Sequence, residues 1–347
     1  MTTKLKAYKY RLYPTQAQKV LLCKTYGCVR FLWNYNVAVF NAFDKEKVEI
    51  SKPLTSTKLR QEYGWMAEVS AATLQQKELD FKEFKKNYFK KSRKVKLGRP
   101  SFKNKYENQS FRLPNQKFKL LENKIQLEKI GKVKMVLDRP VPTDSRNVSV
   151  TISKNKCNQY FASVLVETEI SEKPKTNKSI GIDVGLSAFV VGSDGFSIEN
   201  PRYFRKSQAK VVKAQKCLSR KAKGSNRRSK TKLKSSKLHN NIANQRKHFL
   251  HEASSKIVAG YDFIGLENLN IIGMMKNRNL ARSIADASWS EFTKMLEYKA
   301  NWYGKDLVKI DRWYPSSKKC NSCGQVKPDL QLNDRVYICT NCGVVDD

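Results

Sequence analysis

Runs of apolar residues at two different spacings organise the first half of the chain. Residues 5–12 alternate apolar and basic side chains, which predicts a strand ended by Pro14. Apolar residues then recur at helical spacing over residues 16–43, 56–63 and 71–91, which predicts three helices. Six shorter runs, separated by turn residues, predict an antiparallel barrel or small sheet; they are residues 110–113, 117–121, 124–127, 132–135, 147–153 and 160–169.

Strands and helices alternate after residue 177, which is typical of an α/β domain. Ser179–Gly185 (Ser-Ile-Gly-Ile-Asp-Val-Gly) reads as a short strand that is apolar on both faces, so we expect the buried central strand of a mixed or parallel sheet. A second apolar run, Tyr261–Glu267, predicts a companion strand. The other expected elements are strands at 188–191, 196–199 and 307–310, a helix from about 284 to 302 ended by Gly304, and a linker at 174–177.

A strongly basic segment interrupts this second half. From Pro201 to Leu250 there are 17 Lys and Arg and no Asp or Glu. Apolar residues keep helical spacing there and the pattern breaks near Gly224, which predicts a helical hairpin over residues 202–258 with one packed stripe and one basic face. Disorder is the alternative for so charged a segment.

The charge of the whole chain indicates its partner. Lys and Arg number 68 against 31 Asp and Glu, a formal net charge of +37, and charge of this size predicts a polyanion, above all nucleic acid. We expect contacts from the basic hairpin and from the lysine-rich helix over residues 71–91, for which a solvated face is the alternative. The basic candidates are Lys82, Lys86, Lys213, Arg220, Arg227, Arg228 and Lys230.

Hydropathy argues against a membrane partner. No stretch of about 18 apolar residues occurs, so we expect no transmembrane helix. The basic N-terminus has no apolar core of the kind found in signal peptides. The expected location is therefore the cytoplasm, in association with the nucleoid.

Four of the eight cysteines form two pairs with the spacing of a metal site. Cys320 and Cys323 precede Cys339 and Cys342 by a gap of 15 residues, and four thiolates at this spacing predict a closed, tetrahedral, structural Zn²⁺ site. Chance pairing of the cysteines, a redox motif and an iron–sulfur site are the alternatives. The other four cysteines are scattered, as expected for reduced thiols packed as small hydrophobic side chains.

Two acidic residues end the two apolar strands. Asp183 and Glu267 would be costly to bury without a partner, so we expect them to share a divalent-metal site. In so basic a protein, an Mg²⁺ pair that binds a scissile phosphate and activates water is the chemistry that fits. The alternatives are a capping carboxylate for Asp183 and an ordinary surface residue for Glu267. Such sites usually have three or four carboxylates, and no catalytic role is assigned to the three histidines, His239, His248 and His251.

The order and spacing of several motifs resemble those of the transposon-encoded TnpB nucleases, which are similar to the ancestors of compact type V CRISPR effectors. The resemblance covers essentially the whole chain. Its motifs are Arg11-Leu-Tyr-Pro-Thr, Gly98-Arg-Pro-Ser-Phe-Lys, Ile180-Gly-Ile-Asp-Val-Gly, Phe263-Ile-Gly-Leu-Glu-Asn-Leu, the Ser283–Gly304 helix with Trp289, Phe292, Tyr298, Lys299 and Ala300, Tyr314-Pro-Ser-Ser-Lys-Lys-Cys, and the paired CxxC.

This resemblance implies an RNA-guided DNA endonuclease. Such a protein binds a transposon-derived guide RNA as a monomeric ribonucleoprotein and cleaves target DNA beside a short adjacent motif, using two Mg²⁺ ions. Asp183 and Glu267 correspond to its first two metal-binding acids, and Gln75 to a residue facing the target-adjacent DNA. The implied domains are a wedge-type β-barrel (1–14 and 94–175), a helical recognition lobe (15–93), an RNase H-like RuvC domain (177–315) and a zinc ribbon (316–345).

One departure concerns the third acid. In the family, the second CxxCG is followed by Asp-Arg-Asp-x-Asn-Ala-Ala, whose second Asp is a metal ligand, whereas this sequence reaches only Asp346-Asp347. Three alternatives follow: the natural chain continues, Asp346 or Asp347 substitutes, or the protein is an RNA-guided repressor that does not cut. An ATPase of the actin and sugar-kinase type also begins with Gly-Ile-Asp-x-Gly, but Leu186 stands where that site has Ser or Thr.

Overall fold

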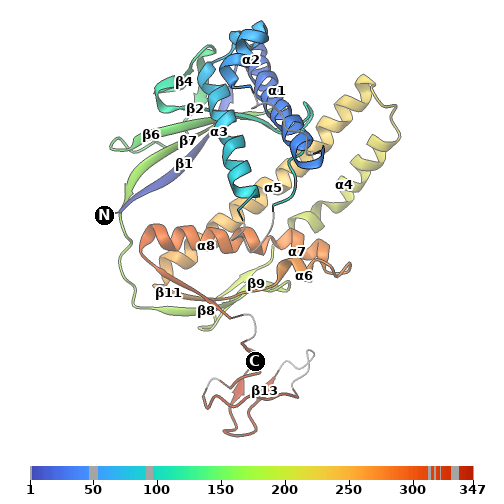
Figure 1. The fold of residues 1–347 in the computed structure, drawn as a ribbon. Helices are drawn as coiled ribbons and strands as arrows, with labels where there is room; N and C mark the ends of the chain where they lie inside the picture. The colour runs from blue at the N-terminus through green and yellow to red at the C-terminus, as the bar shows by residue number, and fades with distance from the viewer. Residues whose placement is uncertain are drawn as a thin grey trace. The chain divides into compact units, whose positions relative to one another are not determined.

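The computed structural model describes residues 2–46, 54–90, 97–311, 314–315, 318–320, 322–329 and 336–346, which form two compact units (Figure 1). Unit 1 consists of residues 1–171 and 211–240, and unit 2 of residues 172–210 and 241–347. Among the described residues, no helix is long and apolar enough to cross a membrane.

Unit 1 is built on a seven-stranded antiparallel sheet in the order β2-β6-β7-β1-β5-β4-β3. The edge strands β2 (Gln109–Pro114) and β3 (Phe118–Leu121) are consecutive in the chain and are joined by one short 3₁₀ helix, η2 (Asn115–Lys117). The two edges must therefore approach each other, which makes the sheet barrel-like and confirms the predicted barrel. The other strands are β1 (Thr2–Tyr13), β4 (Lys124–Leu127), β5 (Gly131–Val136), β6 (Arg146–Lys154) and β7 (Tyr160–Ile170).

Alternation of side chains gives this sheet one buried face, and helices complete its core. The helices of the unit are α1 (Gln16–Glu46), α2 (Ser56–Glu62), η1 (Gly64–Glu68) and α3 (Ala71–Tyr88). The apolar stripe of α1 places Leu22 and Leu32 in the same core as Val164 of β7. Further along α1, Phe40 packs against Phe81 of α3. The helical spacing in the sequence thus predicted a real packing stripe.

Unit 2 contains a five-stranded sheet in the order β10-β9-β8-β11-β12. Strands β8 (Ser179–Asp183), β9 (Ala188–Gly192) and β10 (Ser197–Glu199) are antiparallel, whereas β11 (Phe263–Glu267) runs parallel to both β8 and β12 (Asp306–Ile310). This mixed order, with the first strand in the centre, is that of an RNase H-like domain, as predicted.

Helices cover one face of this sheet. Unit 2 holds the start of α4 (Tyr203–Ser219), the second half of α5 (Asn226–Gly260), and α6 (Ile271–Met274), α7 (Ala281–Ala287) and α8 (Trp289–Tyr303). Phe189 of β9 contacts Phe249 of α5 and Phe292 of α8 edge-on, each with ring centroids 4.9 Å apart. Because α4 and α5 are joined near Gly224, the predicted helical hairpin is confirmed.

Two predictions about unit 2 are wrong. Strand β8 is not buried on both faces, because Ile180 and Ile182 are buried whereas Gly181 and Asp183 are exposed. Gly181, which was counted as apolar in the sequence, lies on the open face. The single helix expected over 284–302 is two helices, since Ser288 has a left-handed φ of 58° between α7 and α8. No glycine or proline marks this break in the sequence.

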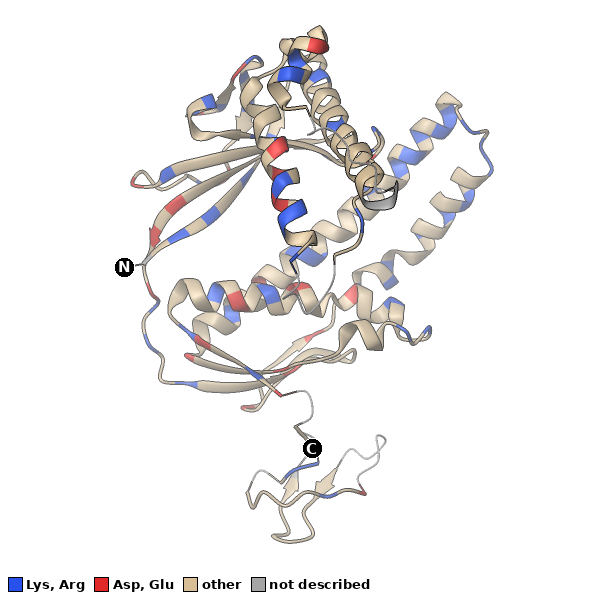
Figure 2. Cartoon of the chain, in the orientation of Figure 1, with Lys and Arg blue, Asp and Glu red and all other residues tan. Residues whose placement is uncertain are grey.

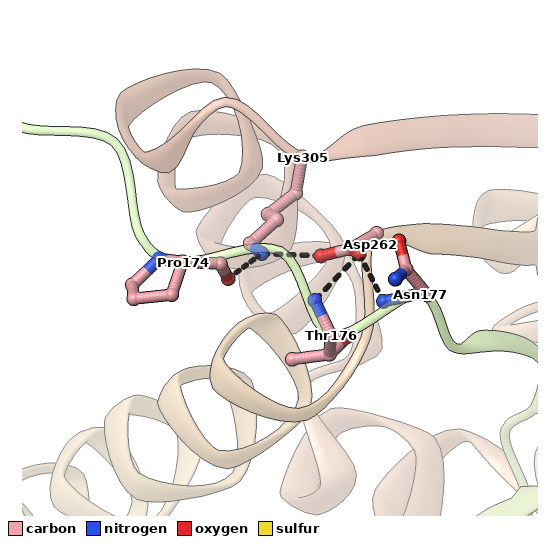
Figure 3. A network of polar contacts seen from close by, with 5 residues as sticks. All are labelled: Pro174, Thr176, Asn177, Asp262 and Lys305. Atoms are coloured by element: carbon pink, nitrogen blue, oxygen red, sulfur yellow. Dashed lines mark hydrogen bonds and ion pairs between the residues drawn. The ribbon is translucent and has the colours of Figure 1, made fainter.

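The predicted linker is tied firmly to the sheet of unit 2 (Figure 3). The Asp262 carboxylate accepts hydrogen bonds from the backbone N–H groups of Thr176 (2.7 Å) and Asn177 (2.6 Å) and forms an ion pair with buried Lys305, which also donates to the Pro174 carbonyl. The hydrogen bond from Lys305 is the main reason that the pKa of Asp262 is lowered to about 2. This network fixes the chain just before β8.

Candidate functional site

Asp183 and Glu267 lie side by side at the ends of two parallel strands. The last paired residues of β8 and β11 are Ile182 and Leu266, both buried, so the next residue on each strand points to the opposite, open face. Neighbouring strands are about 4.8 Å apart, which brings the two carboxylates close together. The sheet therefore joins two acids that are far apart in the sequence.

Electrostatics supports this proximity. The pKa of Asp183 is raised, first because surrounding protein partly desolvates its carboxylate, although the residue is accessible to solvent, and second because the negative charge of Glu267 lies nearby. A hydrogen bond from the backbone of Val184 opposes both effects. Two carboxylates held in this way favour a cation between them, and their oxygens are ligands that Mg²⁺ prefers. Their residue types and placement fit a divalent-metal site.

In the described part of the chain, no third ligand residue joins Asp183 and Glu267. There, the only group of three or more candidate metal ligands is the cysteine cluster. Asp346 lies in the short strand β14 (Val345–Asp346). The third acid thus stays a prediction.

The four cysteines come together as expected. The sulfur atoms of Cys320, Cys323, Cys339 and Cys342 all lie within 4.8 Å of one another, and two pairs are 3.5 Å apart. A tetrahedral zinc ion with Zn–S bonds of about 2.3 Å requires S–S separations of about 3.8 Å, so the cluster has the size that zinc needs.

Each cysteine pair sits in the same kind of turn. In both, the glycine after the second cysteine, Gly324 or Gly343, has a positive φ and donates its N–H to the carbonyl of the first cysteine, at 3.0 Å. Backbone N–H groups of the second turn lower the pKa of Cys339 to about 6, which favours the thiolate. Strands β13 (Tyr337–Ile338) and β14 pair beside this turn.

The basic hairpin carries most of the predicted nucleic-acid contacts, and Figure 2 shows lysine and arginine along both of its helices. Lys213, Arg220, Arg227 and Lys230 are exposed, as a binding face requires. Arg228 is different, because its guanidinium donates to the carbonyls of Leu218 and Lys221, each at 2.8 Å, and so holds the hairpin turn together.

The candidates on α3 are also at the surface. Gln75 and Lys86 are exposed, and Lys82 forms an ion pair of 2.9 Å with Glu78 one turn earlier. They share unit 1 with the described tip of the hairpin. None of them lies in unit 2, where the acid pair is found.

The burial of one lysine was not predicted from the sequence. Lys299 of α8 is only 6% exposed, and its ammonium donates to the His251 carbonyl (2.8 Å) and to the hydroxyls of Ser254 (2.7 Å) and Ser255 (2.8 Å). Burial is the main reason that its pKa is lowered to about 8. Its spacing from Phe292 and Leu296 on the apolar stripe of α8 is the signal that could have revealed it.

Together, these features define a two-unit protein with an RNase H-like domain, an acid pair at its central strands and a four-cysteine ribbon. Three family models match the chain: "Probable transposase" at residues 162–278, "Cas12f1-like, TNB domain" at 289–347 and "Helix-turn-helix domain" at 1–40. The last description does not fit the segment, which forms β1 and most of α1.

Two curated relatives match nearly the full length. A Streptomyces pristinaespiralis protein, named as a candidate RNA-guided DNA endonuclease, is 37% identical over 99% of this chain and 86% of its own. InsQ of Escherichia coli K12, named in the same way, is 29% identical over 97% of this chain and 87% of its own. The fold is similar to that in a cryo-EM structure of a Cas12f1-sgRNA-target DNA complex, with a TM-score of 0.51 and 12% identity over 94% of this chain and 92% of that one. The chain belongs to the TnpB family.

Proposed function

We propose that this protein is an RNA-guided DNA endonuclease associated with a transposon. It binds a transposon-derived guide RNA and target DNA, recognises a short motif beside the target, and cleaves by metal-assisted hydrolysis. Its membership of the TnpB family and the names of its relatives support the guide RNA and DNA as partners. The observation that carries the cleavage step is that Asp183 and Glu267 each follow the last paired residues of two parallel strands and that the charge of Glu267 raises the pKa of Asp183.

The proposed chemistry requires both carboxylates to be charged. Asp183 and Glu267 are the proposed Mg²⁺ ligands, and their mutual repulsion is offset when a cation is bound. A divalent ion held by these two carboxylates would supply a binding site for the scissile phosphate and would lower the pKa of a water molecule. Because Gly181 and Asp183 lie on the exposed face of β8, a nucleic-acid backbone can approach the pair from that side.

The remaining parts take supporting roles in this proposal. Residues 1–14 with 94–175 are the wedge-type barrel, residues 15–93 the recognition lobe that carries Gln75, and residues 177–315 the nuclease domain. The basic hairpin holds nucleic acid through Lys213, Arg220, Arg227 and Lys230. The ribbon over 316–345 binds a structural Zn²⁺ through its four cysteines, because no ligand position is left open for chemistry. The complex is a monomeric ribonucleoprotein.

The test compares Asp183→Asn with a matched control, Asp306→Asn. Asp306 is an exposed acid on the same sheet, at the opposite end of a strand parallel to β8 and β11. The protein is co-purified with its cellular RNA, the RNA is sequenced, and the complex is given Mg²⁺ and DNA matching the guide. We expect Asp183→Asn to bind guide RNA normally and lose cleavage, whereas Asp306→Asn cleaves normally.

Two results would contradict parts of this proposal. Normal cleavage by Asp183→Asn removes Asp183 from the site. Guide-dependent DNA binding by the wild-type protein without cleavage, in Mg²⁺ or Mn²⁺, instead identifies an RNA-guided repressor.

A further inference from the structure

An arginine-lined pocket opens beside the strand that carries Asp183. It has a volume of about 550 Å³ and lies within unit 2. Four exposed arginines line it. Arg202 and Arg205 lie at the start of α4, Arg278 lies in the loop before α7, and Arg282 lies in the first turn of α7. We call these four residues and the hollow between them the arginine pocket.

The positive charge of this pocket is largely uncompensated. Asp286 is the one acid in its lining, and both of its carboxylate oxygens accept the backbone N–H of Phe204, at 3.0 and 3.1 Å. Asp286 therefore serves as the cap of α4. Arg202 donates to the Leu186 carbonyl at 3.3 Å, and no ion pair within the described part of the chain involves Arg205, Arg278 or Arg282.

The chemistry of the lining selects an anion with several oxygens. The guanidinium group is permanently charged and presents a planar fork of N–H donors that matches a phosphate. Several such forks around a polar hollow disfavour an apolar ligand. Since Asp286 is already used by α4, an incoming phosphate does not compete with an internal carboxylate for these arginines.

The position of the pocket indicates which phosphate it holds. Leu186 and Ser187 line it, and they follow Asp183 by only three and four residues. Four residues of chain span at most about 14 Å, so the pocket wall lies within a few nucleotides of the acid pair. A strand whose backbone reaches the acids passes close to the arginines.

We propose that the arginine pocket binds a backbone phosphate of the DNA strand that is to be cut and so positions that strand for Asp183 and Glu267. This inference rests on the proposed nuclease function and adds to it a phosphate-binding site on unit 2. The guide RNA could supply the same chemical group, so the experiment separates the two sources.

The experiment measures binding and not cleavage. Arg278→Gln/Arg282→Gln is made in the Asp183→Asn background and loaded with guide RNA, and its affinity for guide-matched single-stranded DNA is measured. The control, Lys119→Gln/Lys294→Gln, removes the same two charges from exposed positions outside the pocket. We expect DNA affinity to fall roughly tenfold to hundredfold in the pocket variant and less than about threefold in the control, with guide RNA affinity unchanged.

A neutral linkage in the DNA identifies the phosphate. Single methylphosphonates are placed in turn along the strand around the expected cut. One position should weaken binding to the parent protein about as much as the arginine substitutions do, and have no further effect on the pocket variant. Arg278→Lys/Arg282→Lys should restore affinity in part, because it keeps the charge and loses the fork.

Three results would overturn the proposal. A loss of guide RNA affinity with DNA affinity unchanged assigns the pocket to the guide RNA. Equal losses in the pocket variant and the control mean that only net charge matters. No loss in either affinity means that the pocket binds neither strand. Because DNA binding is measured without cleavage, failure of the nuclease assignment gives a different pattern: normal DNA binding and a wild-type protein that does not cut.

Discussion

The buried ammonium of Lys299 should make the stability of unit 2 rise with pH above neutrality. The lysine pKa is about 8 in the folded protein, against an ordinary value of 10.5. Below pH 8 both the folded and unfolded states carry the proton, so folding bears the full cost of burying the charge. Between about 8 and 10.5 the unfolded state binds more protons than the folded state, and the free energy of unfolding increases with pH.

The size of this effect follows from the shift. A change of 2.5 pKa units, the difference between 10.5 and about 8, corresponds to about 3 kcal/mol. Replacing the lysine in Lys299→Met removes the titration and leaves the hydroxyls of Ser254 and Ser255 without this donor. The prediction therefore concerns the slope with pH and not the stability at any one pH.

Urea unfolding between pH 7 and 11 tests this prediction. Unfolding is monitored by the fluorescence of Trp289 and Trp302 in a variant in which the other three tryptophans are replaced by phenylalanine. Both reporters lie on α8 with Lys299. Relative to Lys299→Met, the wild type should gain about 3 kcal/mol across this range. Lys294→Met, at an exposed position of the same helix, should follow the wild type. Parallel profiles for wild type and Lys299→Met would refute the reasoning.

Four further predictions concern other parts of the molecule. Phe292→Ala should lower the free energy of unfolding by about 3–5 kcal/mol, measured by the same urea assay, because Phe292 is fully buried; Phe263→Ala, at an exposed position, should cost less than about 1 kcal/mol. A strong chelator should make the four ribbon thiols react with Ellman's reagent. Cys323→Ser should make the three remaining ribbon thiols react without chelator, whereas Cys217→Ser should leave all four ribbon thiols unreactive. Wild type should be more stable than Asp262→Asn by a constant amount above about pH 4, and this difference should vanish as the pH falls through about 2, because the pKa of Asp262 is lowered in the folded state. Thermal unfolding at several pH values measures the difference. Affinity for nucleic acid should fall by orders of magnitude between about 50 and 200 mM salt. Lys213→Gln/Arg227→Gln should reduce the slope of the logarithm of the binding constant against the logarithm of the salt concentration by about 2. An unchanged slope would contradict a role for the hairpin in binding.

Much of the fold was readable from the sequence because it depends on local patterns. Alternation predicted the strands of unit 1, and the apolar stripes predicted α1, α3 and the α4–α5 hairpin. The paired cysteines predicted their own cluster, since two residues between cysteines is the spacing of a tight turn. The closeness of Asp183 and Glu267 was predicted from the similar ends of two strands, and the parallel register supports it.

Other features depend on contacts that no local pattern records. Gly181 lies on the open face of β8 with Ser179 and Asp183, and because it has no side chain the run could be read as apolar on both faces. At the break between α7 and α8, the guanidinium of Arg246 donates to the Ala285 carbonyl and to the Ser288 hydroxyl. Arg246 belongs to α5 and is more than 35 residues away in sequence. The arginine pocket combines α4 with the loop before α7, although the abundance of Asn and Arg after Glu267 was a partial signal.

Strand β1 pairs with β7, the last strand of its unit in chain order. Strand β1 matches β7 from Thr2 to Leu12 against Ile170 to Tyr160. On a ribosome adding about 5–20 residues per second, β1 stays unpaired for roughly ten to thirty seconds until β7 has been synthesised. The lysines that alternate along β1 oppose self-association of this strand while it is unpaired. The charges that suit a polyanion therefore also reduce aggregation of the incomplete chain during synthesis.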